Sequence, residues 1–258
     1  MTTSPYSGRP ESAWLGITGK LVEKHPLKRG VLLQAAISTW GTLWQTTVGS
    51  GRTSVGLAEL KVPATIIGYF FEILLAMELE RRQPMVWRGS QSKDEKDLVY
   101  LPDPAFSVEI KTSGQRGFKV YGNRSYGQRT ARDVPAKKEK SGYYITVNFF
   151  GQTLTLLRFG WIDADDWDPQ EAPTGQMAGL GKAVYDYELL AISGSYRQQA
   201  PVIVLDGVGP KTEELLAGIG IRTVGDLMRY TGELPPALTR IKDSNGDFLA
   251  ACIDKPSP

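Results

Sequence analysis

The chain has 258 residues, enough for one large domain or for a main domain with a small additional module. Hydrophobic residues at 41% and charged residues at 22% are ordinary for a soluble globular protein. No apolar run reaches the roughly eighteen residues of a membrane span, and the polar N-terminus lacks the apolar core of a signal peptide. The net charge of +2 excludes the strongly basic class of histone-like binders. We therefore expect a cytoplasmic protein with no membrane partner.

The counts of cysteine and histidine limit which disulfides, metal sites and catalytic bases the chain can form. Cys252, the one cysteine, excludes an internal disulfide framework and multi-cysteine metal sites, and it suits a reducing cytosol. His25, the one histidine, excludes zinc sites built from several histidines and leaves one candidate for a histidine base. A metal, if the chain uses one, should have oxygen ligands, which favour Mg²⁺, with Mn²⁺ as a possible substitute.

The first third of the chain is predicted to be helical. Apolar residues recur at three-and-four spacing over residues 13–24, 29–48 and 62–82, and the second helix is expected to end at Gly49 to Gly51. In the third helix, Glu72 lies either on the solvated face or in the active site as a further metal or water ligand. The predicted buried face of that helix comprises Ile66, Ile67, Phe70, Ile73, Leu74 and Met77.

A hairpin is predicted between residues 98 and 113, after a short strand over 85–87 and a polar turn over 91–97. Period-two alternation places Glu109 and Lys111 on one face of the second strand, and Asp103 in the turn is expected to face them. Two carboxylates can hold a hard divalent cation while a lysine orients the attacking water, as phosphodiester hydrolysis requires. The alternative is an edge hairpin with solvated side chains, because D-x5-E-x-K is common by chance.

The next segment, residues 114–128, is rich in Gly, Arg, Asn and Gln and is predicted to be a long loop. Arg suits guanine and Asn or Gln suits adenine, so the loop either reads DNA or is simply a polar loop. Residues 111–140 carry nine basic residues and two acidic ones, a local field suited to a polyanion. The candidate DNA contacts are Gln115, Arg116, Lys119, Asn123, Arg124, Ser125, Tyr126 and Gln128.

Two clear strands follow over 143–150 and 153–159, joined by Gly151-Gln152, after a helix end over 134–140. The order of helix, three strands, helix segment and strand is that of the PD-(D/E)xK nuclease core, an α/β fold with a mixed central sheet flanked by helices. The resemblance extends to the ScaI family of type II restriction endonucleases over residues 14–168. It is carried by the third helix and by EKDLVYLPDPAFSVEIKTS, GNRSYGQ, KSGYYITVNFF and LRFGWIDADDW.

This resemblance implies a Mg²⁺-dependent endonuclease that cuts double-stranded DNA at a short palindromic site, in a restriction–modification system. It implies Asp103 and Glu109 as metal ligands, together with Ile110, and Lys111 as the residue that positions water. A homodimer is expected because a palindrome presents the same edges twice. A cognate DNA methyltransferase is expected to act on the same site without binding this chain.

A second DNA-binding element is predicted over residues 202–230, which resemble a helix-hairpin-helix module. Its glycines let backbone N–H groups approach a phosphate, and the helix that follows adds partial positive charge. Such a hairpin binds the DNA backbone rather than the bases. An ordinary αα-hairpin with glycine turns is the alternative. The candidate contacts are Gly207, Val208, Gly209, Lys211 and Thr212.

The predicted organisation has four parts: a helical N-terminal segment (1–55), the nuclease core (56–168), a linker (169–182), and an all-α helix-hairpin-helix module with a tail (183–258). Two other functions stay open from the residues themselves. One is a structure-specific repair or recombination nuclease, which would cut only forks, flaps or junctions. The other is a non-catalytic DNA-binding protein, which would retain DNA without cutting it.

Overall fold

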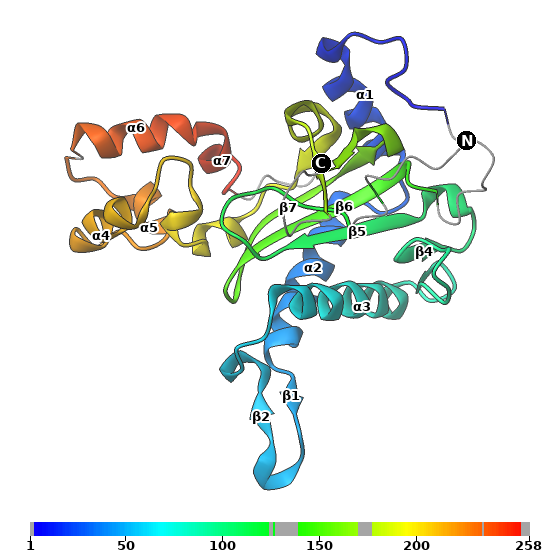
Figure 1. Ribbon diagram of the computed structural model, residues 1–258, viewed down its shortest axis with the longest axis horizontal. Coiled ribbons are helices and arrows are strands. Elements are labelled where there is room, and N and C mark those ends of the chain that lie inside the picture. The colour runs from blue at the N-terminus through cyan, green and yellow to red at the C-terminus, as the bar shows by residue number, and fades with distance from the viewer. Residues whose placement is uncertain (1–2, 124–125, 127–138, 170–176, 234, 254–258) are drawn as a thin grey trace.

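A six-stranded mixed sheet lies at the centre of the molecule (Figure 1). The computed structural model describes residues 3–123, 126, 139–169, 177–233 and 235–253. The strand order is β10-β7-β6-β5-β4-β3, and every neighbouring pair is antiparallel except β5 and β6, which are parallel. The strands are β3 (Trp87–Gly89), β4 (Leu98–Tyr100), β5 (Val108–Ser113), β6 (Gly142–Phe150), β7 (Thr153–Ile162) and β10 (Leu189–Ala191).

The two predicted long strands are confirmed as β6 and β7. Their apolar runs are buried along almost their whole length, as expected for strands in the middle of a sheet covered on both faces. The turn between them contains Gly151 with a φ of 57°, a left-handed conformation that glycine adopts without strain. The predicted helix end over 134–140 falls largely on residues 127–138, which lie outside the described residues.

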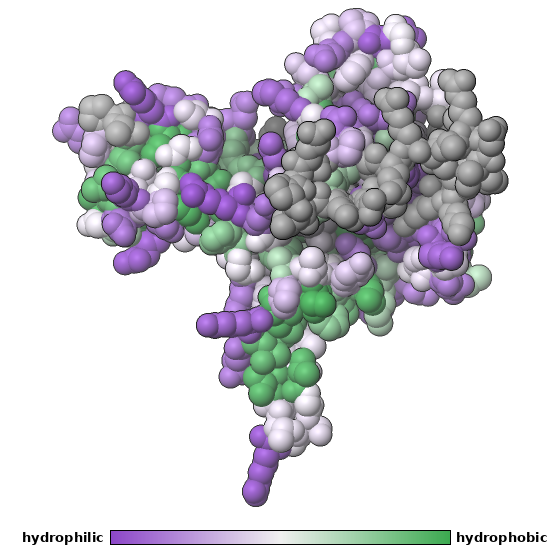
Figure 2. Space-filling model, viewed as in Figure 1, coloured by the Kyte–Doolittle hydropathy of each residue, from purple (hydrophilic) through white to green (hydrophobic). Residues whose placement is uncertain are grey.

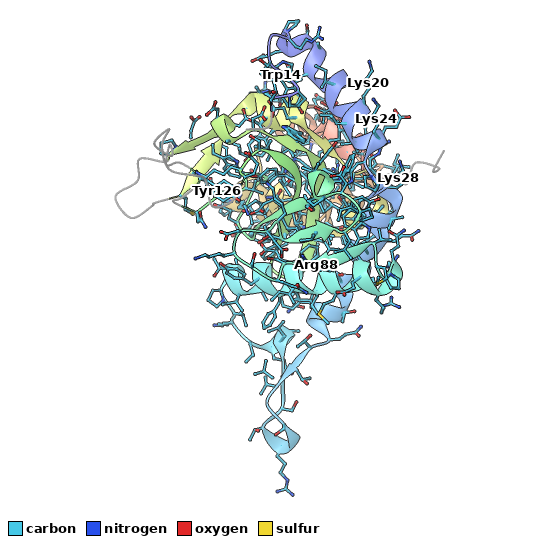
Figure 3. All side chains as sticks on the ribbon, turned by 90° about the vertical axis from the view of Figure 1, so that its right-hand side faces the viewer. Trp14, Lys20, Lys24, Lys28, Arg88 and Tyr126 are labelled. Carbon is cyan, nitrogen blue, oxygen red and sulfur yellow. The ribbon has the colours of Figure 1, made fainter. Side chains whose placement is uncertain are left out.

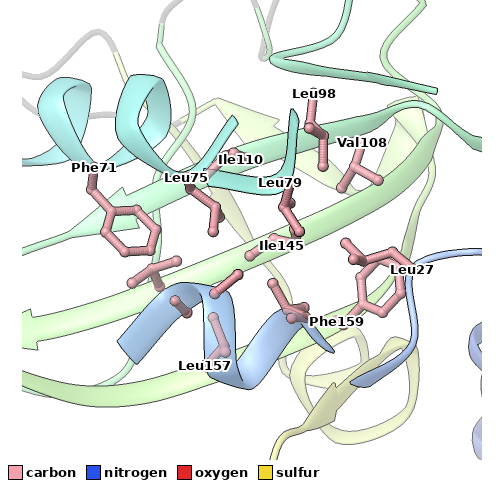
Figure 4. Packing of buried hydrophobic residues seen from close by; sticks show 14 of the residues in the cluster. Leu27, Phe71, Leu75, Leu79, Leu98, Val108, Ile110, Ile145, Leu157 and Phe159 are labelled. Atoms are coloured by element: carbon pink, nitrogen blue, oxygen red, sulfur yellow. The ribbon is translucent and has the colours of Figure 1, made fainter. Parts of the chain in front are cut away.

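Two helices cover one face of the sheet, and a third packs at its β7–β10 edge. These helices are α1 (Glu11–Lys24), α2 (Arg29–Trp44) and α3 (Ala64–Arg82), and α1 contacts both β7 and β10. Figure 4 shows Phe71, Leu75 and Leu79 of α3 packed toward Ile110 of β5 and Ile145 of β6. All five side chains are fully buried, so this layer is the main hydrophobic core.

The second helix ends four residues earlier than predicted. It stops at Trp44, and the β-branched residues that follow begin a two-stranded finger of β1 (Thr47–Val48) and β2 (Val55–Gly56). Gly49 and Gly51 have φ values of 90° and 53° and turn the chain at the tip, beside η1 (Gly51–Thr53). The finger projects away from the body of the molecule (Figure 1). The return to α3 passes through η2 (Leu57–Glu59).

The predicted buried face of α3 is largely wrong. Ile66, Phe70, Ile73 and Met77 are 39–58% exposed, whereas Phe71, Leu75, Ala76 and Leu79 are buried; of the predicted set, Ile67 is buried and Leu74 half-buried. The helix is apolar on both sides, so its pattern does not determine which side packs inward. Gly68 does: a Cβ built there would lie 2.1 Å from Thr112 Oγ1, so this side of the helix approaches β5 closely.

More of the chain forms strands than predicted, both in a separate two-stranded sheet and as an edge strand of the central sheet. Part of the predicted linker forms β9 (Ala178–Leu180), which pairs with β8 (Trp167–Pro169) after the short η4 (Ala164–Asp166). Residues 183–192, where a short helix is expected at the start of the all-α module, instead form a π-helical turn, η5 (Val184–Glu188), followed by the edge strand β10. Gly160 makes this pairing possible, because a Cβ there would lie 1.8 Å from the carbonyl oxygen of Glu188.

A second, smaller hydrophobic core lies within residues 200–252. The tail beyond residue 230 contributes Leu238, Ile241 and Cys252 to it. The elements around this core are η6 (Ser195–Gln199), η7 (Val202–Val204), α4 (Pro210–Gly218), α5 (Val224–Arg229), α6 (Pro236–Ser244) and α7 (Gly246–Ala250).

The described part of the chain holds no helix that is both long and apolar enough to cross a bilayer.

The acidic segment after β7 does not lie wholly in solvent. Glu188 is 1% exposed and hydrogen-bonds the carboxyl group of Asp166, while Asp163 N donates to Asp166 Oδ2 at 2.6 Å. Burial, and then the charge of Asp166, raise the pKa of Glu188 to about 9. One proton shared by the pair avoids two buried charges. The Oε2 atom of Glu188 has no hydrogen-bond partner in the structure, so ionisation there is costly.

Replacement of Glu188 by Gln should stabilise the fold at alkaline pH. Because the folded-state pKa is raised above that of the unfolded chain, the folded state binds more protons and stability falls as pH rises from about 5 to 9. Gln does not ionise, so Glu188→Gln should gain about 1–3 kcal/mol in urea unfolding at pH 9 and little at pH 5. Glu214→Gln, at an exposed position, is the control. An equal effect at both pH values would contradict the shared proton.

Candidate active site

The side chains of Glu109 and Lys111 project from the face of the sheet opposite to Ile110 and the main core, as the alternation predicts. The Lys111 ammonium donates to Glu109 Oε1 at 2.6 Å, with side-chain exposures of 15% and 3%. The parallel register sets Tyr144 beside Glu109 and Thr146 beside Lys111. Both side chains are therefore largely buried among the strands of the central sheet and do not lie on an exposed hairpin.

The second carboxylate of this cluster is Asp97, and the structure does not bring Asp103 to it. Antiparallel pairing of Leu98 with Val108 places Asp97 opposite Glu109. Asp97 Oδ2 accepts a hydrogen bond from Ile110 N at 2.8 Å and lies 4.0 Å from Lys111 Nζ.

Asp103 instead lies in the exposed turn beyond β4, where it begins η3 (Pro104–Phe106). Its Oδ1 accepts from Ala105 N at 3.0 Å, which is the role of an N-cap residue. Sequence reasoning missed Asp97 because it ends a stretch that reads as a polar turn. Asp97 lies twelve residues before Glu109 in the sequence, and Asp103 lies closer. The pairing of the two short strands nevertheless brings Asp97, and not Asp103, opposite Glu109. The signal that could have found Asp97 is its position immediately before the first strand of the hairpin.

The Lys111 ammonium lies among three oxygen atoms. These are Glu109 Oε1 at 2.6 Å, the Ile110 carbonyl at 3.1 Å and Asp97 Oδ2 at 4.0 Å. Burial lowers the pKa of Lys111, but the charges of Glu109 and Asp97 outweigh it and raise the pKa above its usual value. Carboxylate and carbonyl oxygens around a cation are the donor set of Mg²⁺ and Mn²⁺. Among the described residues, no three His, Cys, Asp or Glu side chains converge as a metal centre. A cation here would therefore use the Ile110 carbonyl as its third protein ligand.

Tyr126, predicted to contact DNA, is directed into the protein. Its hydroxyl donates to Glu109 Oε1 at 2.6 Å, and its ring packs against Trp167 with a centroid distance of 4.8 Å. Gly122 permits this packing, because a Cβ there would lie 2.8 Å from the Tyr126 ring. Burial, and then the charge of Glu109, raise the pKa of Tyr126, so its hydroxyl remains a donor. Figure 3 shows Tyr126 across the sheet from Lys24 and Lys28.

Two other candidates have different environments. Glu72 is half-buried on α3, one turn after Gly68, the residue that packs against Thr112 beside Lys111. His25 is fully buried: Leu27 N donates to its Nδ1 and its Nε2 lies 3.0 Å from the Phe106 carbonyl. Burial lowers the pKa of His25 to about 4, so the ring is neutral near pH 7 and anchors the start of α2 rather than acting as a base.

The loop after β5 lies between the cluster and the second core. Of its candidates for DNA contact, Gln115, Arg116, Lys119 and Asn123 are exposed. Arg124, Ser125 and Gln128 lie outside the described residues. Arg116 Nε donates to the Ile203 carbonyl at 2.9 Å, and the ring of Phe118 stacks on Phe248 at 4.8 Å. These contacts join the loop to the smaller core, so the two are positioned together.

The glycine turn of the smaller core has the conformation that a backbone contact needs. Gly207 is exposed with a φ of 78°, Gly209 caps α4, and Lys211 is exposed on the first turn; Val208 is buried and Thr212 half-buried. Asn245 makes two hydrogen bonds to Asp206, the residue before Gly207: its Oδ1 accepts from Asp206 N at 3.0 Å and its Nδ2 donates to the Asp206 carbonyl at 3.1 Å. This turn is therefore rigidly presented at the surface.

Comparison with known proteins identifies relatives of most of the chain. A family model described as ScaI restriction endonuclease matches residues 4–193. The Type II restriction enzyme ScaI of Streptomyces caespitosus is 34% identical over 197 residues, which are 73% of this chain and 84% of that protein. No solved structure matches the chain. The family match contains the whole central sheet and the Asp97–Glu109–Lys111 cluster, and it ends before the second core begins.

Loss of the Tyr126 hydroxyl should weaken cation binding at the cluster. Outer groups that orient a ligating carboxylate commonly contribute on the order of 10–100-fold in metal affinity. We expect Tyr126→Phe to weaken Mn²⁺ binding to that extent by isothermal titration calorimetry. Tyr185→Phe is the matched control, since that half-buried tyrosine accepts from Val120 N instead. Equal affinity in the two variants would show that Tyr126 does not position Glu109.

Proposed function

The chain belongs to the ScaI restriction endonuclease family, and we propose that it cuts DNA with the cluster of Asp97, Glu109 and Lys111. It is accordingly a site-specific DNA endonuclease of a restriction–modification system. The observation that carries the assignment of the cutting centre is the position of the Lys111 ammonium among the oxygens of Glu109, Ile110 and Asp97.

The fold is consistent with a PD-(D/E)xK core. A helix, α3, precedes an antiparallel meander of β3, β4 and β5, and β6 then lies parallel to β5. Asp97 immediately precedes the second strand of the meander, and Glu109-Ile110-Lys111 lies on the third. This order supports Asp97 as the aspartate of the motif, in place of Asp103.

We propose that Asp97, Glu109 and the Ile110 carbonyl hold a divalent cation, Mg²⁺ or in substitution Mn²⁺. When bound, such an ion supplies Lewis acidity and neutralises charge that develops on the phosphate. Lys111 donates a hydrogen bond to the attacking water and so holds it in line with the P–O3′ bond that breaks. Tyr126 keeps the Glu109 carboxylate in place throughout. Glu72 stays a candidate for a further ligand of the cation or of the water.

Recognition and retention of double-stranded DNA are assigned to separate parts. The exposed loop residues Gln115, Arg116, Lys119 and Asn123 are proposed to read base edges or phosphates, and the same role is proposed for Arg124, Ser125 and Gln128. The glycine turn and Lys211 form the phosphate-binding part of a helix-hairpin-helix module. A homodimer supplies the second cluster that a double-strand cut requires, and a cognate methyltransferase protects the same site.

Replacing each of the two candidate aspartates by asparagine, in separate variants, distinguishes their roles. Asp97→Asn should lower the rate of plasmid cleavage by on the order of 10²–10³-fold, the loss typical of one electrostatic contact to a transition state. Asp103→Asn should cut at nearly the parent rate, because an amide oxygen can still cap η3. Gel shifts in Ca²⁺ should show that both variants retain DNA. The reverse ranking of cleavage rates would restore Asp103 as the ligand.

Lys211→Ala should weaken DNA binding equally on cognate and unrelated duplexes. Loss of one phosphate contact should also reduce the slope of log affinity against log salt by about 1. Fluorescence anisotropy at several salt concentrations measures both quantities. Arg240→Ala, at an exposed position on α6, is the control. A loss restricted to the cognate duplex would reassign Lys211 to base recognition, and an unchanged slope would remove it from the interface.

A further inference from the structure

The outer side of α3 carries a continuous apolar stripe. Its residues are spaced by three, four, seven and eleven positions, so they line one side of the helix, and each is exposed. The finger continues this surface with Val48 and Val55, which pair directly across β1 and β2. Figure 2 shows the hydrophobic colour along α3 and over the part of the finger next to it. The stripe comprises Ile66, Tyr69, Phe70, Ile73 and Met77.

We propose that this α3–finger surface is where a second copy of the chain docks about a two-fold axis. The inference rests on the proposed function, because each chain supplies one Asp97–Glu109–Lys111 cluster and a double-strand break needs two. Exposed apolar patches of this kind mark interaction sites on soluble proteins. A helix that is apolar on both sides normally lies in an interior, and here the second copy completes that interior.

The charges at the two ends of α3 match an antiparallel arrangement. Lys61 is exposed just before the helix, and Glu80 is exposed at its far end, where it continues the stripe. A two-fold axis between Phe70 and Ile73 sets Ile66 of one copy against Met77 of the other and brings Lys61 toward the end of the partner helix that carries Glu80. Arg81 and Arg82 at that end pair with Glu78 of their own chain. The first turn of α3 begins at Pro63 without a side-chain cap. A carboxylate from a second copy near that turn interacts favourably with the helix dipole.

The finger supports the same arrangement. Its ladder consists of two residue pairs, Thr47 with Gly56 and Val48 with Val55. A two-stranded ribbon of this length is marginal in water without an apolar surface to pack on. It leaves the body at the end of α2 and returns toward the start of α3, so it flanks the stripe (Figure 1). In a two-fold dimer each finger lies along the other copy and gains that surface.

The oligomeric state of the full chain tests the proposal. Sedimentation velocity should show a dimer for the parent and a shift to monomer for Ile73→Asp, at concentrations where the parent is dimeric. Ile73 is exposed, so the substitution leaves the main core intact, and circular dichroism verifies folding. Leu215→Asp, at a position on α4 that is also exposed, should stay dimeric. A monomeric parent, or a dimeric Ile73→Asp variant, would overturn the proposal.

Site-directed crosslinking gives an independent result. Cys252 is the chain's one cysteine and is fully buried, so Ile73→Cys introduces a single accessible thiol near the proposed axis. Mild oxidation with copper phenanthroline should yield a disulfide-linked dimer for Ile73→Cys and not for Leu215→Cys. Equal crosslinking of the two variants would refute the surface.

The cutting pattern separates this proposal from the proposed function. On a supercoiled plasmid with one site, Ile73→Asp should accumulate nicked circles rather than linear product, since each monomer keeps an intact cluster. Asp97→Asn should remain dimeric and cut both strands on the order of 10²–10³-fold more slowly than the parent. An Asp97→Asn dimer that cuts at the parent rate would refute the cutting centre alone, whereas an Ile73→Asp monomer that linearises the plasmid at the parent rate would refute the dimer's role alone.

Discussion

The antiparallel pairing of β4 with β5 is the constraint on which the site depends. The pair is short, with Leu98 opposite Val108, yet it fixes Asp97 opposite Glu109, and the hydrogen bond from Ile110 N to Asp97 holds that register. A slip of one residue would turn Glu109 and Lys111 into the main core and bring Ile110 out of it. The apolar contacts of Val108 and Ile110 with α3 therefore protect the chemistry on the opposite face.

Much of this arrangement could be predicted from the sequence. Period-two alternation correctly separates Glu109 and Lys111 from Ile110, and the β6–β7 hairpin, the end of α1 and the start of α2 follow from local pattern. The partner of Glu109 could not be identified in this way, because strand register is a non-local property. Asp103 is nearer along the chain, whereas Asp97 is nearer in space.

The inward side of α3 could not be predicted for a related reason. A hydrophobic period locates a buried side only when the other side is polar, and here Phe71 and Ile73 are equally apolar neighbours. The close approach of Gly68 to Thr112 decides between them, and that contact joins residues 44 positions apart. The second apolar side is then available for another interface. The two apolar sides of α3 are therefore consistent with a helix that packs into the main core of its own chain on one side and against a second copy on the other.

The charges of the cluster explain why Lys111 is needed even before any reaction. Two carboxylates, one of them 3% exposed, face each other across β4 and β5, and without a cation their repulsion would oppose the pairing that aligns them. The ammonium of Lys111 offsets that repulsion inside the folded chain. The Tyr126 hydroxyl adds a second donor to Glu109 from the loop that leads toward the proposed DNA contacts. The geometry of the proposed cutting centre is thus coupled, through one hydrogen bond, to the conformation of the segment proposed to recognise DNA.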